Sequence, residues 1–81
     1  MSYPENKAVR VKALSHPTLS VEFQNGPDII LDLTELLKTR EIYWRLRQER
    51  YFKQVSLDPL GGICWPEGED LAPDGLHRYQ K

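Results

Sequence analysis

Residues 18–24 alternate between apolar and polar side chains, and this alternation constrains the fold more than any other feature of the chain. Leu19, Val21 and Phe23 fall on one face, with polar residues between them. A period of two residues is typical of a half-buried β-strand. An Asn-Gly pair follows, which favours a hairpin turn because both residues tolerate positive φ. We therefore expect residues 28–33 to return as the neighbouring antiparallel strand.

A further strand is predicted upstream, over residues 8–14. Val9, Val11 and Ala13 are expected on its buried face, with basic residues between them. Pro17 follows soon after, and proline cannot donate a backbone hydrogen bond to a sheet. The first part of the chain thus predicts three antiparallel strands in a meander.

The middle of the chain has the composition of helices. Thr34 is predicted to cap a short helix whose buried side comes from Leu36 and Leu37. The apolar positions of residues 40–51 form two separate lines on a helical wheel. We therefore expect a break at residues 39–40 and a single helix beyond it.

Two more strands are predicted in the last third, over residues 54–58 and 63–65, with a turn between them. Pro73 is well placed to begin a short terminal helix. The whole pattern predicts a single α+β domain over residues 7–81, preceded by a flexible lead-in over residues 1–6. Its expected form is a small antiparallel sheet of four to five strands, with a short central helix and a short C-terminal helix.

The size and charge of the chain exclude several classes of protein. A chain of 81 residues has room for one domain, and a net charge of -1 argues against general binding to nucleic acid or anionic membranes. A single cysteine permits no intramolecular disulfide. The N-terminus has no apolar leader pattern, and no apolar run approaches the length of a membrane span. A cytoplasmic protein is therefore expected.

Residues 61–78 gather several groups that often serve chemistry. Glu67, Glu69 and Asp70 lie close to His77 in sequence, and clustered carboxylates suit a hard metal ion. Their spacing, however, matches no calcium-binding loop. We expect instead that Asp70 accepts backbone N–H groups in a turn and that the two glutamates are solvated.

Cys64 is the candidate nucleophile, but it falls in a predicted strand, where a free cysteine usually packs as a small hydrophobe. A base is also needed, and the sequence places neither His16 nor His77 beside it. The chain contains no glycine-rich phosphate loop and no zinc-ligand pattern. We expect no enzymatic activity, no metal and no cofactor.

Charge is unevenly distributed along the chain. Residues 38–53 hold six Lys or Arg and two Glu, whereas residues 54–76 hold five carboxylates and no basic residue. Either the two stretches face each other or both are solvated. Aromatic and arginine side chains anchor protein interfaces, and arginine beside exposed rings also contacts nucleic acid. Protein binding is the leading hypothesis, and a nucleic-acid-binding regulator using segment 40–53 is the alternative. The candidate partner-binding residues are Trp44, Arg45, Arg47, Arg50 and Tyr51.

The C-terminal part contains the pattern Trp-x-x-Gly-x-Asp-Leu-x-Pro-x-x-Leu, and the first half has the order strand, turn, strand, Asp-Leu. The chain thereby resembles domain-of-unknown-function family 2442, a family of small bacterial proteins, over about residues 8–78. The resemblance implies an α+β fold on an antiparallel sheet and no catalytic residues. It gives structural roles to the motif residues Trp65, Gly68, Asp70, Pro73 and Leu76.

The resemblance also implies a partner. Members of this family are often encoded beside another small protein, in pairs that look like toxin–antitoxin modules. An antitoxin-like protein that binds the product of a neighbouring gene is therefore expected. The predicted meander also leaves a sheet edge open, which would allow two copies to pair as a homodimer.

Overall fold

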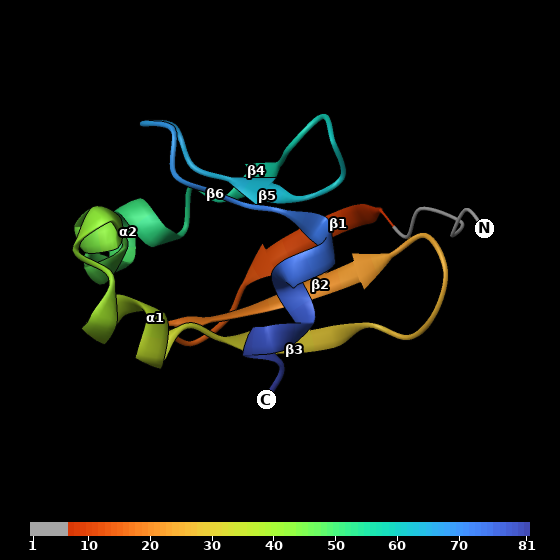
Figure 1. Cartoon of the computed structure of the whole chain (residues 1–81), viewed down its shortest axis with the longest axis horizontal. Coiled ribbons are helices and arrows are strands. Elements are labelled where there is room, and N and C mark those ends of the chain that lie inside the picture. The colour runs from red at the N-terminus through yellow and green to blue at the C-terminus, as the bar shows by residue number, and fades with distance from the viewer. Residues whose placement is uncertain (1–6) are drawn as a thin grey trace.

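The computed structural model describes residues 7–81, and the predicted lead-in over residues 1–6 lies outside that description. The chain forms two separate antiparallel sheets of three strands each (Figure 1). The first sheet confirms the predicted meander, and Gly26 in its hairpin turn has a φ of 103°. Its strands, in the spatial order β1-β2-β3, are β1 (Ala8–Ala13), β2 (Thr18–Phe23) and β3 (Ile29–Asp32).

The buried face of the first sheet matches the prediction for β2 but not throughout β1. Leu19 and Val21 are fully buried. In β1 the pairing register shifts between Ala8 and Arg10, so Ala8 is buried whereas Val9 is 45% exposed. A bulge inserts one residue into a strand and reverses the sides of the positions beyond it. The prediction that Val9 faces the core was therefore wrong.

The second sheet overturns the prediction of one sheet with four to five strands. The predicted fourth and fifth strands exist in shorter form, but they pair with a sixth strand instead of extending the first sheet. Short connections cause this arrangement, because tight turns bring each strand back onto the strand that precedes it. The α+β class with antiparallel pairing is confirmed. The strands of this sheet are β4 (Ser56–Leu57), β5 (Ile63–Cys64) and β6 (Asp70–Leu71).

Three short helical segments lie at one end of the first sheet (Figure 1). They are α1 (Thr34–Thr39), the 3₁₀ helix η1 (Glu41–Arg47) and α2 (Glu49–Phe52). The predicted break is confirmed, since Arg40 is extended with φ -119° and ψ 103°. The single helix predicted beyond it is wrong, because Gln48 is extended as well. Leu46 and Phe52 are both fully buried, and a separation of six residues would place them on different faces of one continuous helix.

The start of α1 is stabilised by Asp32 and not by the predicted cap, Thr34. Thr34 is the first residue of the helix, and its side chain does not cap it. The carboxylate of Asp32 accepts the backbone N–H of Thr34 at 2.9 Å and the Thr34 hydroxyl at 2.6 Å. These two hydrogen bonds lower the pKa of Asp32.

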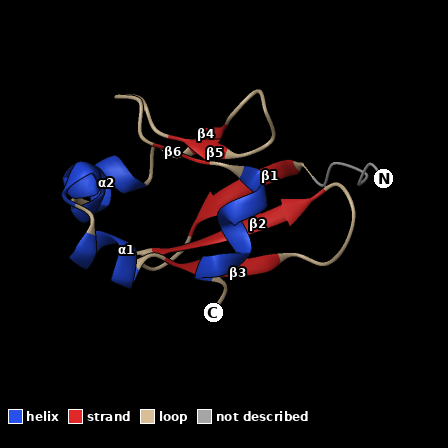
Figure 2. Ribbon diagram, viewed as in Figure 1, coloured by secondary structure: helices blue, strands red, loops and turns tan. Residues whose placement is uncertain are grey.

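The 3₁₀ helix η2 (Pro73–Tyr79) crosses the first sheet near the C-terminus (Figure 2). It begins at Pro73, as predicted, and its Leu76 is fully buried. The chain then reaches β3, where the N–H of Lys81 donates to the carbonyl of Ile30 at 2.8 Å. The sheets are also linked directly, by a hydrogen bond of 2.8 Å from Ala8 N–H to the Gly61 carbonyl. Within residues 7–81, no helix has the length and apolar character that a membrane crossing requires.

Candidate interaction surface on helix η1

Trp65 fixes the second sheet against the helical end of the molecule. Its side chain is almost fully buried, and its indole N–H donates to the carbonyl of Phe52 at 2.9 Å. The two rings lie 6.0 Å apart between centroids, and the His16 ring meets Phe52 edge-on at 4.9 Å. Trp65 thus packs in the core, as expected. Burial of a large ring stabilises a small core strongly.

The turn after Trp65 places a carboxylate in the interior. Gly68 adopts a φ of 109°, which other residues rarely tolerate, and its N–H donates to the Trp65 carbonyl at 3.0 Å. The Trp65 N–H in turn donates to the Glu69 carbonyl at 2.9 Å. The Trp-x-x-Gly part of the motif thus closes a hairpin that fixes the backbone of Glu69.

Glu69 is buried, with only 3% of its side chain exposed. The Tyr51 hydroxyl donates to Glu69 Oε1 at 2.6 Å, and Arg45 Nη1 lies 3.3 Å from Glu69 Oε2. The prediction that Glu69 is solvated was therefore wrong. Of the two arrangements considered for the charged stretches, these contacts show that they face each other at this point.

The contacts of Glu69 decide its ionisation state. Burial alone would raise the pKa of Glu69, but the hydrogen bonds from Tyr51, its own backbone N–H and Arg45 outweigh burial and hold that pKa below its ordinary value. The pKa of Tyr51 is raised, first by burial and then by its hydrogen bond to Glu69. The Tyr51 oxygen also accepts the Glu67 N–H at 2.8 Å. The carboxylate is thus ionised and satisfied at neutral pH.

Asp70 has a different place from the one predicted. It pairs in β6, and its backbone carbonyl accepts the Tyr43 hydroxyl at 3.2 Å. Across residues 7–81, side-chain carboxylates bond the backbone of a following residue at Asp32 and Asp58, and not at Asp70. The same part of the chain contains no group of three or more His, Cys, Asp or Glu side chains arranged to hold a metal ion.

Cys64 lies half-buried in β5, with its sulfur 3.6 Å from the Ser56 hydroxyl. The His16 side chain makes other contacts, because its Nε2 bonds the carbonyl of Leu46 at 2.8 Å and its ring packs on Phe52. The histidine is therefore engaged in holding η1 and α2.

Two of the candidate partner-binding residues serve mainly internal contacts. Tyr51 is bonded to Glu69, as described above. Arg47 donates twice to the carbonyl of Leu37, from Nε at 3.1 Å and from Nη2 at 2.9 Å. Its Nη2 also lies 3.4 Å from Glu41 Oε1. Arg47 thereby joins the end of η1 to α1.

The other candidates lie at the surface, and η1 adds an apolar residue to them. Trp44 is 46% exposed, and the Arg45 guanidinium carbon lies 4.7 Å from the centre of its ring. Ile42 is 65% exposed, although Leu46, four residues further along η1, is fully buried. Arg50 is exposed on α2. We refer to Ile42, Trp44 and Arg45 together as the Trp44 surface.

The backbone of η1 explains why Ile42 and Leu46 differ in burial. A 3₁₀ helix has three residues per turn, so residues i and i+3 share a face. η1 is also kinked at Tyr43, whose φ of -98° and ψ of 22° are not helical. Tyr43 and Leu46 lie on the core side, whereas Ile42, which precedes the kink, is exposed. Sequence reasoning assumed the α-helical period. It also missed Glu69, for which the signal was the opposite charge of the two neighbouring stretches.

These features define a class: a small α+β protein with two three-stranded antiparallel sheets and a buried, ion-paired glutamate that joins the second sheet to the helical end. The chain belongs to the family described as proteins of unknown function (DUF2442), whose model matches residues 8–81. The resemblance inferred from the C-terminal motif is thereby confirmed. No curated protein and no solved structure matches the chain significantly.

Proposed function

We propose that this protein is a non-enzymatic protein-interaction module and that the Trp44 surface is where its partner binds. The observation that carries the proposal is the exposed Trp44 ring stacked against Arg45. Tryptophan and arginine are the residue types most enriched among the side chains that dominate binding energy at interfaces. An exposed tryptophan on a chain with a well-formed core is accounted for if another protein covers it.

The surface is organised before binding. Arg45 is held from below by the buried carboxylate of Glu69 and lies against Trp44 from the side. A side chain that is already ordered loses little conformational entropy when a partner covers it. The link between Glu69 and Arg45 therefore supports affinity without any contact between Glu69 and the partner.

Exposed arginines that precede and follow η1 in the chain favour an acidic partner. The side chains of Arg40 and Arg50 make no hydrogen bond or ion pair with any residue between 7 and 81. A partner segment that carries carboxylates beside an apolar group would pair with these arginines and cover Ile42. Complementary charge of this kind speeds association and fixes the orientation of binding.

The family context supplies a candidate partner. If family members work in pairs with a neighbouring small protein, the partner of this chain is the product of the adjacent gene, and the chain acts as the antitoxin-like member. This assignment rests on the resemblance, whereas the location of the surface rests on η1.

Nucleic acid is the less favoured ligand of the same segment. Arg45 is paired with Glu69, and Arg47 is engaged by Leu37 and Glu41. Fewer cations are then available for phosphates, and phosphate neutralisation supplies most of the affinity of non-specific nucleic-acid binders. A shift in the electrophoretic mobility of a nucleic acid at physiological salt would instead support the alternative, a nucleic-acid-binding regulator.

The test is calorimetric titration of the full chain with the purified product of the adjacent gene. Trp44→Ala should weaken binding by about thirtyfold or more, as expected for a residue that dominates an interface. Leu60→Ala is the matched control, because Leu60 is 78% exposed but lies in the β4–β5 turn, outside the Trp44 surface. Equal binding by wild type and Trp44→Ala, or an equal loss in Leu60→Ala, would refute the proposed surface.

A further inference from the structure

Three exposed apolar side chains belong to segments that meet away from the Trp44 surface. Val9 of β1 is 45% exposed, Leu57 of β4 is 39% exposed, and Leu60 in the β4–β5 turn is 78% exposed. β1 packs against β4, and the Ala8 N–H donates to the Gly61 carbonyl at 2.8 Å. In Figure 1, the start of β1 and the β4–β5 turn lie away from α1 and α2. We refer to Val9, Leu57 and Leu60 together as the Leu60 corner.

The turn that carries Leu60 is held by its own hydrogen bonds and by β1. The Asp58 carboxylate accepts the Leu60 N–H at 2.7 Å, and the Asp58 carbonyl accepts the Gly61 N–H at 2.9 Å. A β-carbon on Gly61 would lie 2.7 Å from Lys7 Cγ, so Lys7 packs directly against the turn. Leu60 thus projects from an ordered backbone, which loses little conformational entropy when the side chain is covered.

Charges of both signs flank the Leu60 corner. Arg10 and Lys12 are exposed on β1, whereas Asp58 places a carboxylate beside Leu60. Lys12 forms no hydrogen bond or ion pair within the described part of the chain, and Arg10 has an exposed pair of 3.4 Å with Glu22. An apolar centre with both charges at its rim is complementary to a copy of itself. A two-fold axis can bring the cations of each copy against the carboxylate of the other.

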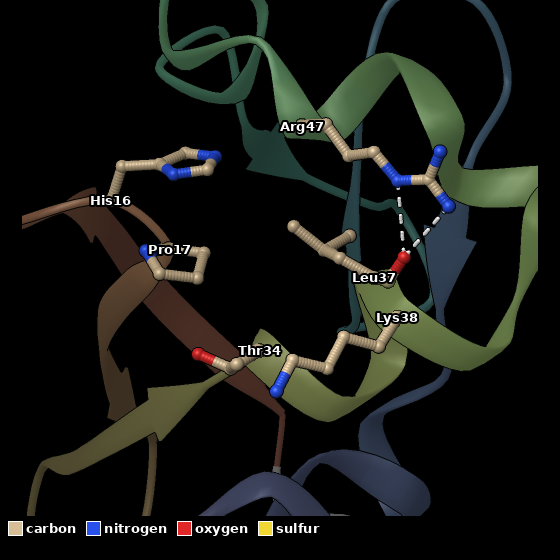
Figure 3. A pocket seen from close by; sticks show the side chains of 6 residues that line it. All are labelled: His16, Pro17, Thr34, Leu37, Lys38 and Arg47. Carbon is tan, nitrogen blue, oxygen red and sulfur yellow. Dashed lines mark hydrogen bonds between the residues drawn. The ribbon is translucent and has the colours of Figure 1, made fainter.

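The hollow between α1 and the turn after β1 lacks this complementarity. Leu37 and Pro17 give it apolar walls, and Arg47, which also lines it, is bonded to the Leu37 carbonyl at 3.1 and 2.9 Å (Figure 3). Lys38 is the other cation among its lining residues, and none of the described carboxylates lines it. A second copy of the hollow would therefore offer this lysine no opposite charge.

We propose that the Leu60 corner binds a second copy of this chain in a two-fold symmetric dimer. Leu60 and Val9 of each copy pack against the other copy, and Asp58 of each copy faces the exposed cations of the other copy's β1. Three apolar side chains make a small interface, so the dimer is reversible, with a dissociation constant of about 10⁻⁴ M. The inference is independent of the proposed interaction function, because the dimer uses none of the residues of the Trp44 surface.

The contact is made by side chains and not by pairing of sheet edges. Two β1 strands paired at their edges would bring Arg10 and Lys12 of one copy beside the same cations of the other, and like charges in cross-strand positions are destabilising. The edge of β3 is bonded to the C-terminus, because the Lys81 N–H donates to the Ile30 carbonyl. Neither edge of the first sheet is therefore suited to a second copy.

The test is sedimentation equilibrium of the full chain from about 10 µM to about 1 mM, a range that spans the expected dissociation constant. The mass should rise from that of one copy to that of two. Leu60→Ala should weaken the dimer at least about tenfold, because each copy loses a leucine side chain that the dimer buries. Ile42→Ala is the matched control, since Ile42 is 65% exposed but belongs to the Trp44 surface.

A second pair of variants tests the charges without disturbing the turn. Asp58→Asn keeps an acceptor for the Leu60 N–H and removes the charge, so it should weaken the dimer about two- to fivefold. Glu35→Gln removes an exposed charge from α1 and should leave the dimer unchanged. A mass of one copy at every concentration, dimerisation of Leu60→Ala equal to that of wild type, or an equal loss in Ile42→Ala or Glu35→Gln would overturn the proposal.

Discussion

Glu69 combines a position in the interior with a full ionic charge, which is rare in a domain of this size. Carboxylates are almost never fully buried unless they are paired, because removal of a charge from water is unfavourable. Here the Tyr51 hydroxyl and the Arg45 guanidinium supply the compensation from two separate helices, η1 and α2. The residue thus ties the hairpin after Trp65 to both helices.

Removal of this side chain should destabilise the fold. Glu69→Ala leaves the Tyr51 hydroxyl and one edge of Arg45 without their acceptor, and we expect a loss of about 2 kcal/mol in the free energy of unfolding. Urea denaturation followed by circular dichroism measures this loss. Glu67→Ala is the matched control, because Glu67 is exposed and only its backbone contacts Tyr51. Equal stability of Glu69→Ala and wild type would contradict the internal role of Glu69.

The same residue predicts a dependence of stability on acid. The pKa of Glu69 is lower in the folded state than in the unfolded chain, so the unfolded state binds the proton more readily. The stabilisation is therefore complete above the ordinary carboxyl range and is lost as pH falls below about 4 through the lowered value. Asp32, whose pKa is also lowered, contributes in the same direction.

The urea midpoint measured across this pH range should fall more steeply in wild type than in Glu69→Gln. The variant keeps the Asp32 contribution and the shape of the side chain, so the difference between the two curves isolates Glu69. Parallel curves for wild type and Glu69→Gln would show that the Glu69 carboxylate has the same pKa in the folded and unfolded states, which would contradict this account.

At the scale of elements, the sequence predicted what depends on local pattern and missed what depends on a change of period. The buried face of β2, the break at residues 39–40 and the start of η2 at Pro73 follow from alternation and proline geometry. The bulge near Ala8 and the 3₁₀ period of η1 depend on how the second sheet and α2 pack, and no local pattern encodes them. Pairing of β5 with β6 was missed because two-residue strands carry almost no periodicity.

The second sheet depends on a close approach at Gly62. A β-carbon at this position would lie 2.3 Å from the Leu71 carbonyl oxygen, a backbone atom that cannot easily move. Gly62→Ala should therefore cost about 2 kcal/mol of stability, in the range of overpacking substitutions. Gly75→Ala is the matched control, because a β-carbon there meets no atom within 4 Å and alanine favours the helix.

Thermal unfolding of Gly62→Ala and Gly75→Ala measures whether the close approach at Gly62 matters for stability. Gly62→Ala should melt below wild type, and Gly75→Ala should melt at the same temperature or slightly above it. A Gly62→Ala protein as stable as wild type would show that β5 and β6 are not packed as closely as described.

At the scale of the whole molecule, the two sheets, the helical end and the C-terminal helix share one hydrophobic core. This core includes Trp65 and Phe52 but leaves Trp44 outside, at the surface of η1. The carboxylate of Glu69 lies between these two regions and orders Arg45 against the exposed ring. We therefore propose that the core holds η1 in place so that it presents its exposed aromatic and cationic side chains to another protein.

The most direct test maps that surface in solution, with the ¹⁵N-labelled chain and the unlabelled product of the adjacent gene. The account predicts that the indole N–H of Trp44 and the amides of residues 41–47 shift on binding, while the buried indole of Trp65 does not. Shifts concentrated on the open face of the first sheet or on the β4–β5 turn, with the Trp44 indole unchanged, would contradict it.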